Sequence, residues 1–419
     1  MNNNHSDNEL NYKMIYKKRL IGPLVKSAIK SFSVIVISGA RQVGKSTFLR
    51  NEFPDFKYIN LDDFSTLEQA KIDPYSLWIG SDKIIIDEVQ KAPEILSAVK
   101  LTVDTTNRTM RFLLSGSSNL LLMKNISESL AGRAIYFEMY PFTYGEIIEN
   151  TSGERNFSLL LKENFKVDDQ TLEVIDPLPF IFKGFMPPLI HINNERDILL
   201  WWESYIKTYI ERDLRDLSQI ESLIDFKKVM DSLAIRTGNI LNQTGIAQDS
   251  GISQPTVYRY IKLLEVSNII KRVPGYFSSK SKRVFKSPKI FFIDPALAVY
   301  LTGYYSKDQL ENANEVGRFF ETMVFLHLQV YAQLMNPKGN IFYWRAFTGK
   351  EVDFVLEQGR KIFIFEVKFT KNPTYNDIKN MQSFIEDHPE TVRGILIYAG
   401  DSIRWMHSKI VAIPWYWIG

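Results

Sequence analysis

A glycine-rich segment near the N-terminus has the residue types and spacing of a phosphate-binding loop. It follows the apolar run Val34–Ser38, which suits a strand buried on both faces. The loop and the helix start after it contain Gly39, Arg41, Gln42, Val43, Gly44, Lys45, Ser46 and Thr47. The glycines let backbone N–H groups turn toward phosphate oxygens, and the helix N-terminus adds partial positive charge. Lys45 is placed to contact the β- and γ-phosphates of a nucleotide, and the Ser46 hydroxyl is placed to ligate Mg²⁺.

Two carboxylates end a predicted strand over residues 82–88, whose centre is three isoleucines, and they supply the second half of such a site. Asp87 and Glu88 stand where this strand should end. Asp87 suits a Mg²⁺ contact, often through water, and Glu88 suits polarising the water that attacks the γ-phosphate. An acidic turn after a buried strand would look the same in isolation. Beside an intact phosphate loop, the pair predicts nucleotide hydrolysis.

Two further residues could take part in hydrolysis. Ser117 follows a predicted strand at Arg111–Ser115 and could sense the γ-phosphate, although a serine-rich turn explains it equally well. Arg133 precedes a predicted strand at Ala134–Glu138 and could act as a finger on the transferring phosphoryl group. A surface arginine is the alternative for Arg133, and the sequence does not decide whether a finger would act within or between subunits.

A third group of chemical residues lies near the C-terminus. Residues 350–357 and 361–369 are apolar β-runs joined by a Gly-containing turn, which predicts a hairpin. Asp353, Glu366 and Lys368 then share one side of it. Two carboxylates suit Mg²⁺, and the lysine could orient or deprotonate a water for attack on phosphorus. Alternatively the site is an inactive scaffold in which Lys368 neutralises the acids.

A helix-turn-helix pattern occupies residues 240–269. A short helix over Thr244–Asp249 is followed by a second helix with Ser253 as N-cap, which would expose Gln254, Thr256, Tyr258, Arg259 and Lys262 to a DNA major groove. The wing predicted over residues 271–289 carries seven basic residues and no acidic one. They are Lys271, Arg272, Lys280, Lys282, Arg283, Lys286 and Lys289. These features indicate DNA as a partner, and packing or subunit contact is the alternative.

The elements that must position these residues follow from the pattern of the chain. Strands alternate with helical segments up to residue 138, which predicts a parallel α/β sheet with its ligand at the C-terminal strand ends, and a strand at Lys57–Asn60 falls between the two nucleotide motifs. The 419 residues contain 51 Lys and Arg against 48 Asp and Glu, so the chain is nearly neutral. There is no cysteine, which excludes disulfides, thiolate metal sites and cysteine nucleophiles. No apolar run approaches the roughly 18 residues of a membrane span.

At these motifs the chain resembles the AAA-type ATPases of bacteria and archaea that carry a C-terminal domain of unknown function. The resemblance rests on GARQVGKST, IIIDEVQ, LLSGSSNLLL and SLAGR, followed by YPFTYGEI. It implies a C-terminal fold similar to restriction endonucleases, with Asp353, Glu366 and Lys368 matching their signature. Glu321 stands where that superfamily often has a further acid, and Val352 replaces the usual proline.

We therefore expect an α/β protein with a P-loop AAA-type ATPase core, a helical lid, a winged helix and a small α/β nuclease-like domain. The expected boundaries are 1–18 for a disordered lead-in, 19–150 for the core, 151–222 for the lid, 223–303 for the winged helix and 304–419 for the nuclease-like domain. The expected function is Mg²⁺-dependent ATP hydrolysis coupled to DNA binding, with metal-dependent cleavage as an open extension. The alternative is an ATP-dependent switch that binds protein partners and has a dead nuclease-like domain. We expect a cytoplasmic location, no membrane contact, and leave open a homo-oligomer.

Overall fold

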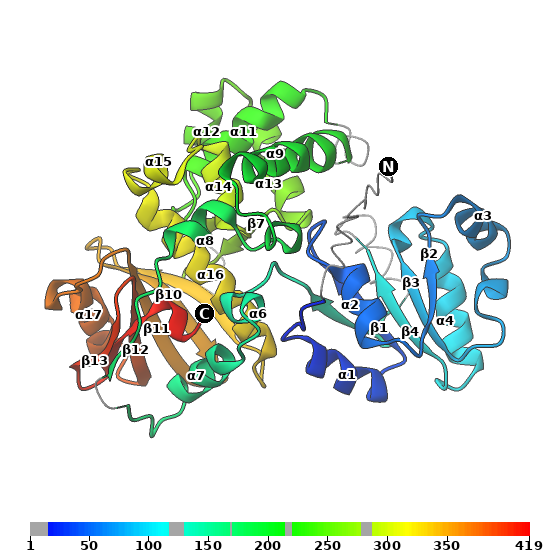
Figure 1. Cartoon of the computed structure of the whole chain (residues 1–419), viewed down its shortest axis with the longest axis horizontal. Coiled ribbons are helices and arrows are strands. Elements are labelled where there is room, and N and C mark those ends of the chain that lie inside the picture. The colour runs from blue at the N-terminus through cyan, green and yellow to red at the C-terminus, as the bar shows by residue number, and fades with distance from the viewer. Residues whose placement is uncertain (1–15, 117–129, 168–169, 214–219, 278–286) are drawn as a thin grey trace, which may run out of the picture.

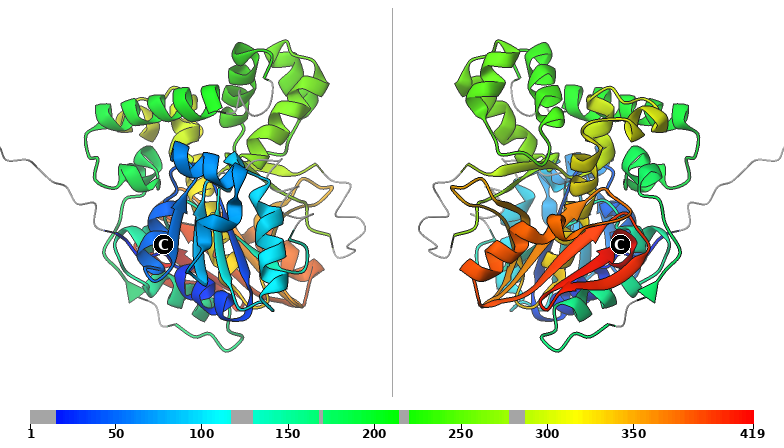
Figure 2. Two further views of the ribbon diagram at one scale, coloured as in Figure 1. Left: turned by 90° about the vertical axis from the view of Figure 1, so that its right-hand side faces the viewer. Right: turned by 90° about the vertical axis from the view of Figure 1, so that its left-hand side faces the viewer.

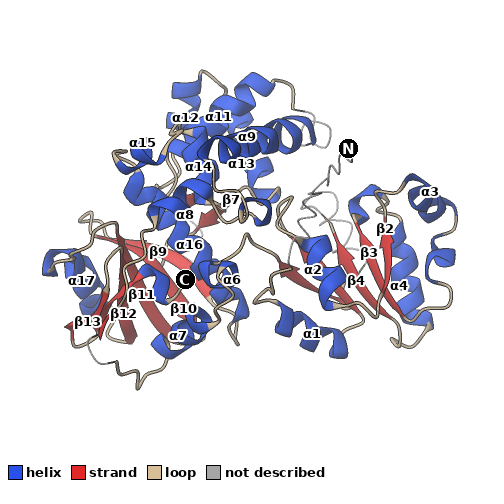
Figure 3. Cartoon of the chain, in the orientation of Figure 1, coloured by secondary structure: helices blue, strands red, loops and turns tan. Residues whose placement is uncertain are grey.

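The computed structural model describes residues 16–116, 130–167, 170–213, 220–277 and 287–419. Two sheets lie side by side, and a helical segment lies over them (Figures 1 and 2). Figure 3 shows the strands gathered into these two groups, apart from one short hairpin. No helix in the described ranges is both long and apolar enough to cross a membrane.

The N-terminal sheet confirms the predicted parallel α/β architecture. Its five strands run in the order β2-β3-β4-β1-β5, all parallel. They are β1 (Val34–Ser38), β2 (Lys57–Asn60), β3 (Lys83–Asp87), β4 (Arg111–Ser115) and β5 (Ala134–Glu138). The strands β2, β4 and β5 have the bounds that the sequence predicted. Because the strands are parallel, β1, β3 and β4 end at one edge of the sheet, where the phosphate loop begins.

Helices cover both faces of this sheet, as the apolar strands require. They are α1 (Gly22–Ser31), α2 (Lys45–Glu52), α3 (Phe64–Ile72) and α4 (Ile95–Thr105). Alternate side chains of a strand point to opposite faces. Ile35 and Ile37 share a buried cluster with α1 and α2, whereas Val34 and Val36 share another with α3 and α4.

Residues 144–171 pack against the C-terminal sheet rather than in a lid over the nucleotide motifs. They form α6 (Tyr144–Ile147), α7 (Ser152–Leu160) and β6 (Gln170–Thr171). The ring of Phe157 stacks on Tyr331, with centroids 4.7 Å apart, and β6 pairs antiparallel with a C-terminal strand. The expected lid or linker over 151–222 thus begins with a stretch whose Phe157 packs on a residue 174 positions further along the chain, and the boundary at 151 stays a prediction.

The middle of the chain is helical and ends in a short hairpin. Its elements are α8 (Leu178–Lys183), α9 (Glu195–Tyr205), a π-helical turn (Ile206–Asp213), α11 (Leu223–Ile235), α12 (Gln243–Ser250), α13 (Gln254–Val266), β7 (Ile270–Val273), β8 (Lys289–Phe292), α14 (Pro295–Leu301) and α15 (Lys307–Glu311). Gly251 has a φ of +69° between α12 and α13, which is the turn that the sequence predicted there. Helix α14 packs against α8, α9 and α11, so the expected lid and winged-helix segments form one packed unit.

The C-terminal part is a mixed sheet behind a long helix. Its elements are α16 (Val316–Leu334), β9 (Asn340–Arg345), β10 (Glu351–Gln358), β11 (Lys361–Lys368), α17 (Lys379–Asp387), β12 (Thr391–Tyr398), β13 (Ser402–His407) and β14 (Ile410–Pro414). The order is β6-β13-β14-β12-β11-β10-β9. The hairpin β10–β11 is antiparallel as predicted, and β12 runs parallel to β11 after the crossover helix α17.

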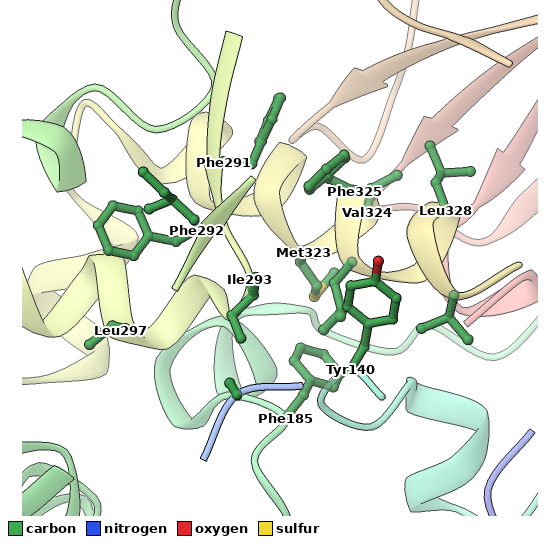
Figure 4. Packing of buried hydrophobic residues seen from close by; sticks show 14 of the residues in the cluster. Tyr140, Phe185, Phe291, Phe292, Ile293, Leu297, Met323, Val324, Phe325 and Leu328 are labelled. Atoms are coloured by element: carbon green, nitrogen blue, oxygen red, sulfur yellow. The ribbon is translucent and has the colours of Figure 1, made fainter. Parts of the chain in front are cut away.

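A continuous buried cluster joins the three parts. Figure 4 shows Phe291 and Phe292 of β8 beside Met323 and Phe325 of α16, with Tyr140 close by. The rings of Phe291 and Phe325 stack at 4.5 Å. Burial of such rings gives a large apolar contribution, so strand β8 is anchored on the C-terminal domain.

Candidate functional site

The phosphate loop has a backbone that only glycine adopts without strain at its two ends. Gly39 has a φ of +151° and Gly44 a φ of +92°. A Cβ at Gly39 would lie 2.3 Å from the carbonyl oxygen of Met139, which is far inside contact distance. Helix α2 begins directly after Gly44, so its free N–H groups face the loop. The local sequence thus builds the anion cradle that was predicted from it.

Lys45 is buried at the centre of this cradle. Its Nζ donates to the carbonyl oxygens of Gly39, at 3.0 Å, and Ala40, at 2.8 Å. Burial lowers the pKa of Lys45 to about 8, although the charges of Glu88 and Asp87 act in the opposite direction. An ammonium that donates to loop carbonyls can exchange these partners for the oxygens of a bound phosphate.

Asp87 sits at the end of β3 and is held by three donors. Its Oδ2 accepts from the hydroxyl of Tyr58 at 2.6 Å, and its Oδ1 accepts from the Ser115 hydroxyl and from the N–H of Glu88 at 3.1 Å. Ser46 lies beside the same Tyr58 hydroxyl. The hydroxyl of Ser46 and the carboxylate of Asp87 therefore converge, and oxygen donors of this kind fit Mg²⁺.

The backbone of Glu88 is left-handed, with a φ of +58°, and so departs from the extended backbone of strand β3 before it. Burial and the neighbouring Asp87 raise the pKa of Glu88, while Lys45 and an amide hydrogen bond from Gln90 act against this. A non-glycine residue at positive φ carries strain, and such strain concentrates at functional sites. The arrangement suits a carboxylate that accepts a proton from water.

A cavity of about 340 Å³ opens over the loop. Its walls include Arg41, Gln42, Gly44, Lys45, Ser46, Thr47 and Glu88, together with Tyr16, Lys17, Arg19, Phe142, Pro187, Pro188, Ile190 and His191. Of the loop residues predicted to bind nucleotide, Gly39 and Val43 lie behind this wall, and Val43 is fully buried. The cavity therefore combines the phosphate loop and the hydrolytic carboxylate with an apolar half.

Sequence reasoning missed Arg19 and the apolar half of the cavity. Arg19 is buried, donates to the carbonyl oxygens of Val43 at 2.8 Å and Tyr140 at 2.6 Å, and pairs with Glu146 at 3.1 Å. It thereby ties the loop to the segment after β5. No motif marks Arg19 or Pro187–Pro188, because their role arises only when distant segments meet.

Arg133 is not near the nucleotide site of its own chain. It precedes Ala134, which pairs with Val34 at the start of β1, whereas the phosphate loop follows the other end of β1. Five residues of strand, about 15 Å, separate the two ends. Its guanidinium instead makes a two-pronged pair with Asp104 at 2.7 and 2.8 Å. A finger acting within the chain is therefore wrong. Ser117 lies outside the described residues, and it is Ser115 that reaches Asp87.

The predicted C-terminal residues do come together. Asp353 Oδ2 accepts from the N–H of Val367 at 2.9 Å, and Lys368 donates to Glu366 Oε1 at 2.7 Å. Glu321, on α16, lies in the same cluster. Burial raises the pKa of both Glu321 and Glu366. Within the described ranges, no group of three or more His, Asp or Glu side chains is arranged to hold a metal ion. The expected Mg²⁺ at the pair Asp353 and Glu366 stays a prediction.

The described basic residues of the predicted wing are all paired within the chain. Lys271 pairs with Glu138, Arg272 with Glu265 at 3.1 Å, and Lys289 with buried carboxylates of the C-terminal domain. Residues 274–276 run beside β9, where the N–H of Tyr276 donates to the carbonyl oxygen of Tyr343 at 2.6 Å. Lys280, Lys282, Arg283 and Lys286 lie outside the described residues. The described part of the basic run predicted over 271–289 therefore has internal partners, and DNA contact by this wing stays a prediction.

Residues 31–148 match the model of the AAA domain family, which agrees with the parallel sheet and the phosphate loop of this part of the chain. Residues 179–308 match a domain of unknown function, DUF8612, and residues 316–418 match another, DUF4143. The first of these spans the expected boundary at 222, in agreement with the packing of α14.

Several proteins resemble the chain over most of its length. An uncharacterized protein of Mycobacterium tuberculosis is 25% identical over 403 residues, which cover 96% of this chain and 84% of the relative. An uncharacterized protein of Methanocaldococcus jannaschii is 26% identical, with 90% and 84% covered. Among solved structures, the Walker-type ATPase of Pyrococcus abyssi is 16% identical at a TM-score of 0.44, covering 67% of this chain and 94% of the other.

Proposed function

We propose that this chain binds and hydrolyses ATP with Mg²⁺ at the cavity over residues 39–47. One observation carries the proposal: Lys45, buried in the phosphate loop, and Glu88, with its raised pKa, line the same cavity. A phosphate tail would lie along the loop N–H groups, where Lys45 exchanges its carbonyl partners for phosphate oxygens. Phe142, Pro187, Pro188 and Ile190 form apolar walls of the cavity. These walls support placing the adenine ring of ATP on that side.

The hydrolytic step requires a base and a fixed water. Glu88 would take a proton from the water as its oxygen bonds to the γ-phosphorus. The bond between the γ-phosphorus and the oxygen that bridges the β- and γ-phosphates would break, which leaves ADP and phosphate. Ser46 and Asp87 would hold Mg²⁺, which neutralises charge on the phosphate oxygens when it is bound. Lys45 would stabilise the charge that develops on the leaving side.

Glu88→Gln tests this function directly. The amide keeps the size of the side chain but cannot accept a proton, so ATP hydrolysis should fall by about 10²- to 10⁴-fold. Binding of ATP should persist, because the loop and Lys45 are intact. Phosphate release measured with Mg²⁺ gives the rate, and the exposed Glu94→Gln is the matched control. Equal hydrolysis by wild type and Glu88→Gln, or none by wild type, would sink the assignment.

We also propose DNA as a partner, on one observation. Helix α13 presents Gln254, Tyr258, Arg259 and Lys262 to solvent, after α12 and the Gly251 turn. Three helices followed by the β7–β8 hairpin occur in the order of a winged helix, which supports this proposal. The internal pairing of Lys271 and Lys289 favours helix α13 over the hairpin as the contact surface.

A further inference from the structure

The ammonium of Lys289 lies inside the acidic cluster of the C-terminal domain. Its Nζ is 2.6 Å from Glu351 Oε1, 3.2 Å from Glu321 Oε1 and 3.7 Å from Asp353 Oδ1. Its side chain is 3% exposed. Lys289 comes from the β7–β8 hairpin of the helical segment, whereas the carboxylates come from α16 and β10. The cluster is therefore completed by a cation from another part of the fold.

The backbone around Lys289 is fixed on both sides. Lys289 pairs with Val273 in β7 and bridges to Ile240. Just before it, the carbonyl oxygen of Ser287 accepts from the hydroxyl of Tyr343 on β9 at 2.6 Å. Two residues later, Phe291 packs on Phe325 and Phe354, at 4.5 and 5.3 Å. These anchors leave the Lys289 side chain little freedom to leave the cluster.

Three of the four carboxylate oxygens of Asp353 and Glu366 already have partners within the cluster. Asp353 directs one oxygen to Lys289 and uses the other to accept from the N–H of Val367. Glu366 accepts from Lys368 through Oε1, while its Oε2 is buried without a hydrogen-bond partner in the described structure. A divalent ion between Asp353 and Glu366 would lie beside two ammonium groups, which repel it. Removing the lysine would leave the buried carboxylates with an uncompensated charge, so the cluster depends on this internal cation.

We propose that Lys289 takes the place of a divalent ion, so that the C-terminal cluster is held together by an internal cation and binds no metal. The same contact fastens the β7–β8 hairpin to the C-terminal sheet. The nuclease-like arrangement of Asp353, Glu366 and Lys368 then belongs to a structural contact between the β7–β8 hairpin and the C-terminal sheet. This inference does not depend on the nucleotide site.

Removing the lysine charge should create a metal site. Mn²⁺ is titrated into the full nucleotide-free chain and followed by calorimetry and by the melting temperature. Wild type should show no saturable Mn²⁺ binding at the cluster, whereas Lys289→Met, which keeps the aliphatic stem, should bind Mn²⁺ at least about tenfold more tightly than the weakest affinity the calorimeter detects. Mn²⁺ should also raise the melting temperature of Lys289→Met but not that of wild type, because it replaces the lost positive charge.

Two controls locate the gained site. Lys271→Met removes a paired lysine of the same hairpin that lies outside the cluster, and it should gain no Mn²⁺ binding. Lys289→Met combined with Asp353→Asn should lose the gained binding. The proposal is overturned if wild type binds Mn²⁺ as tightly as Lys289→Met and Asp353→Asn abolishes that binding. It is equally overturned if Lys289→Met is folded by circular dichroism and gains none. If Lys289→Met does not fold, wild type still tests the proposal. Mn²⁺ binding by wild type that the single variant Asp353→Asn abolishes would overturn it.

Discussion

At the scale of single residues, the nucleotide site depends on side chains whose surroundings are local in sequence. Lys45 finds its partners in Gly39 and Ala40, six and five residues away, so the loop could be predicted from nine consecutive letters. Arg133 could not be placed in this way. Its partner Asp104 is 29 residues distant, and only the register of β1 and β5 shows which end of the sheet it occupies.

The same distinction explains Lys289. A basic run in the sequence normally indicates a solvated surface. The carboxylates that pair with Lys289 are 32 to 64 residues further along, on α16 and β10, and nothing near the lysine announces them. Asp353, Glu366 and Lys368 were found because two β-runs joined by a turn must pair. The cation that completes their cluster was not found, because it arrives from a separate element.

At the scale of elements, apolar patterns predicted strands well and their tertiary partners poorly. The five-residue strands β1 and β4 were predicted to the residue, because a strand buried on both faces is a continuous apolar run. Helix α7 was assigned to a lid. Its buried Phe157 and Leu160 show only that one face needs a partner, and the partner proved to be the C-terminal sheet.

Helix α13 carries the prediction for DNA. If its exposed face contacts phosphates, Lys262→Ala should weaken binding to a fluorescent duplex and reduce the slope of log affinity against log salt by about 1. Fluorescence anisotropy at several salt concentrations measures both. The exposed Lys57→Ala, on the edge strand β2, is the matched control. Indifference of wild type to DNA at low salt would contradict the proposal and favour a switch that acts on protein partners.

At the scale of the whole molecule, segments distant in sequence are joined by buried polar contacts. The hydroxyl of Tyr331 donates to the carbonyl oxygen of Ile418 at 2.6 Å. The N–H of Tyr144 donates to His327 Nε2 at 2.9 Å, so the proton of this imidazole is on Nδ1, which donates to the carbonyl oxygen of Met323. The segment after the AAA domain is thereby fixed to α16.

His327 predicts how this joint responds to pH. Burial lowers the pKa of His327 to about 4, below the usual 6.5, so the unfolded chain binds its proton more readily. Its contribution is present above pH 6.5 and is lost as the pH falls toward 4, by up to about 3 kcal/mol. Denaturant unfolding at pH 7 and pH 4.5 should show a smaller loss for His327→Gln, which keeps an acceptor without titrating. The exposed His407→Gln should behave as wild type, and equal losses in all three proteins would contradict the assignment.

The central claim is that the cavity over residues 39–47 receives the phosphates of ATP. Its most direct test is calorimetric titration of ATP with Mg²⁺ into the full chain at pH 7, compared with Lys45→Ala. At this pH Lys45 is charged. We expect saturable binding by wild type and an affinity lower by about 10- to 100-fold in the variant. The variant loses hydrogen bonds between charged groups, which are worth roughly 1.5–3 kcal/mol. Absence of binding by wild type, or equal binding by both proteins, would contradict it.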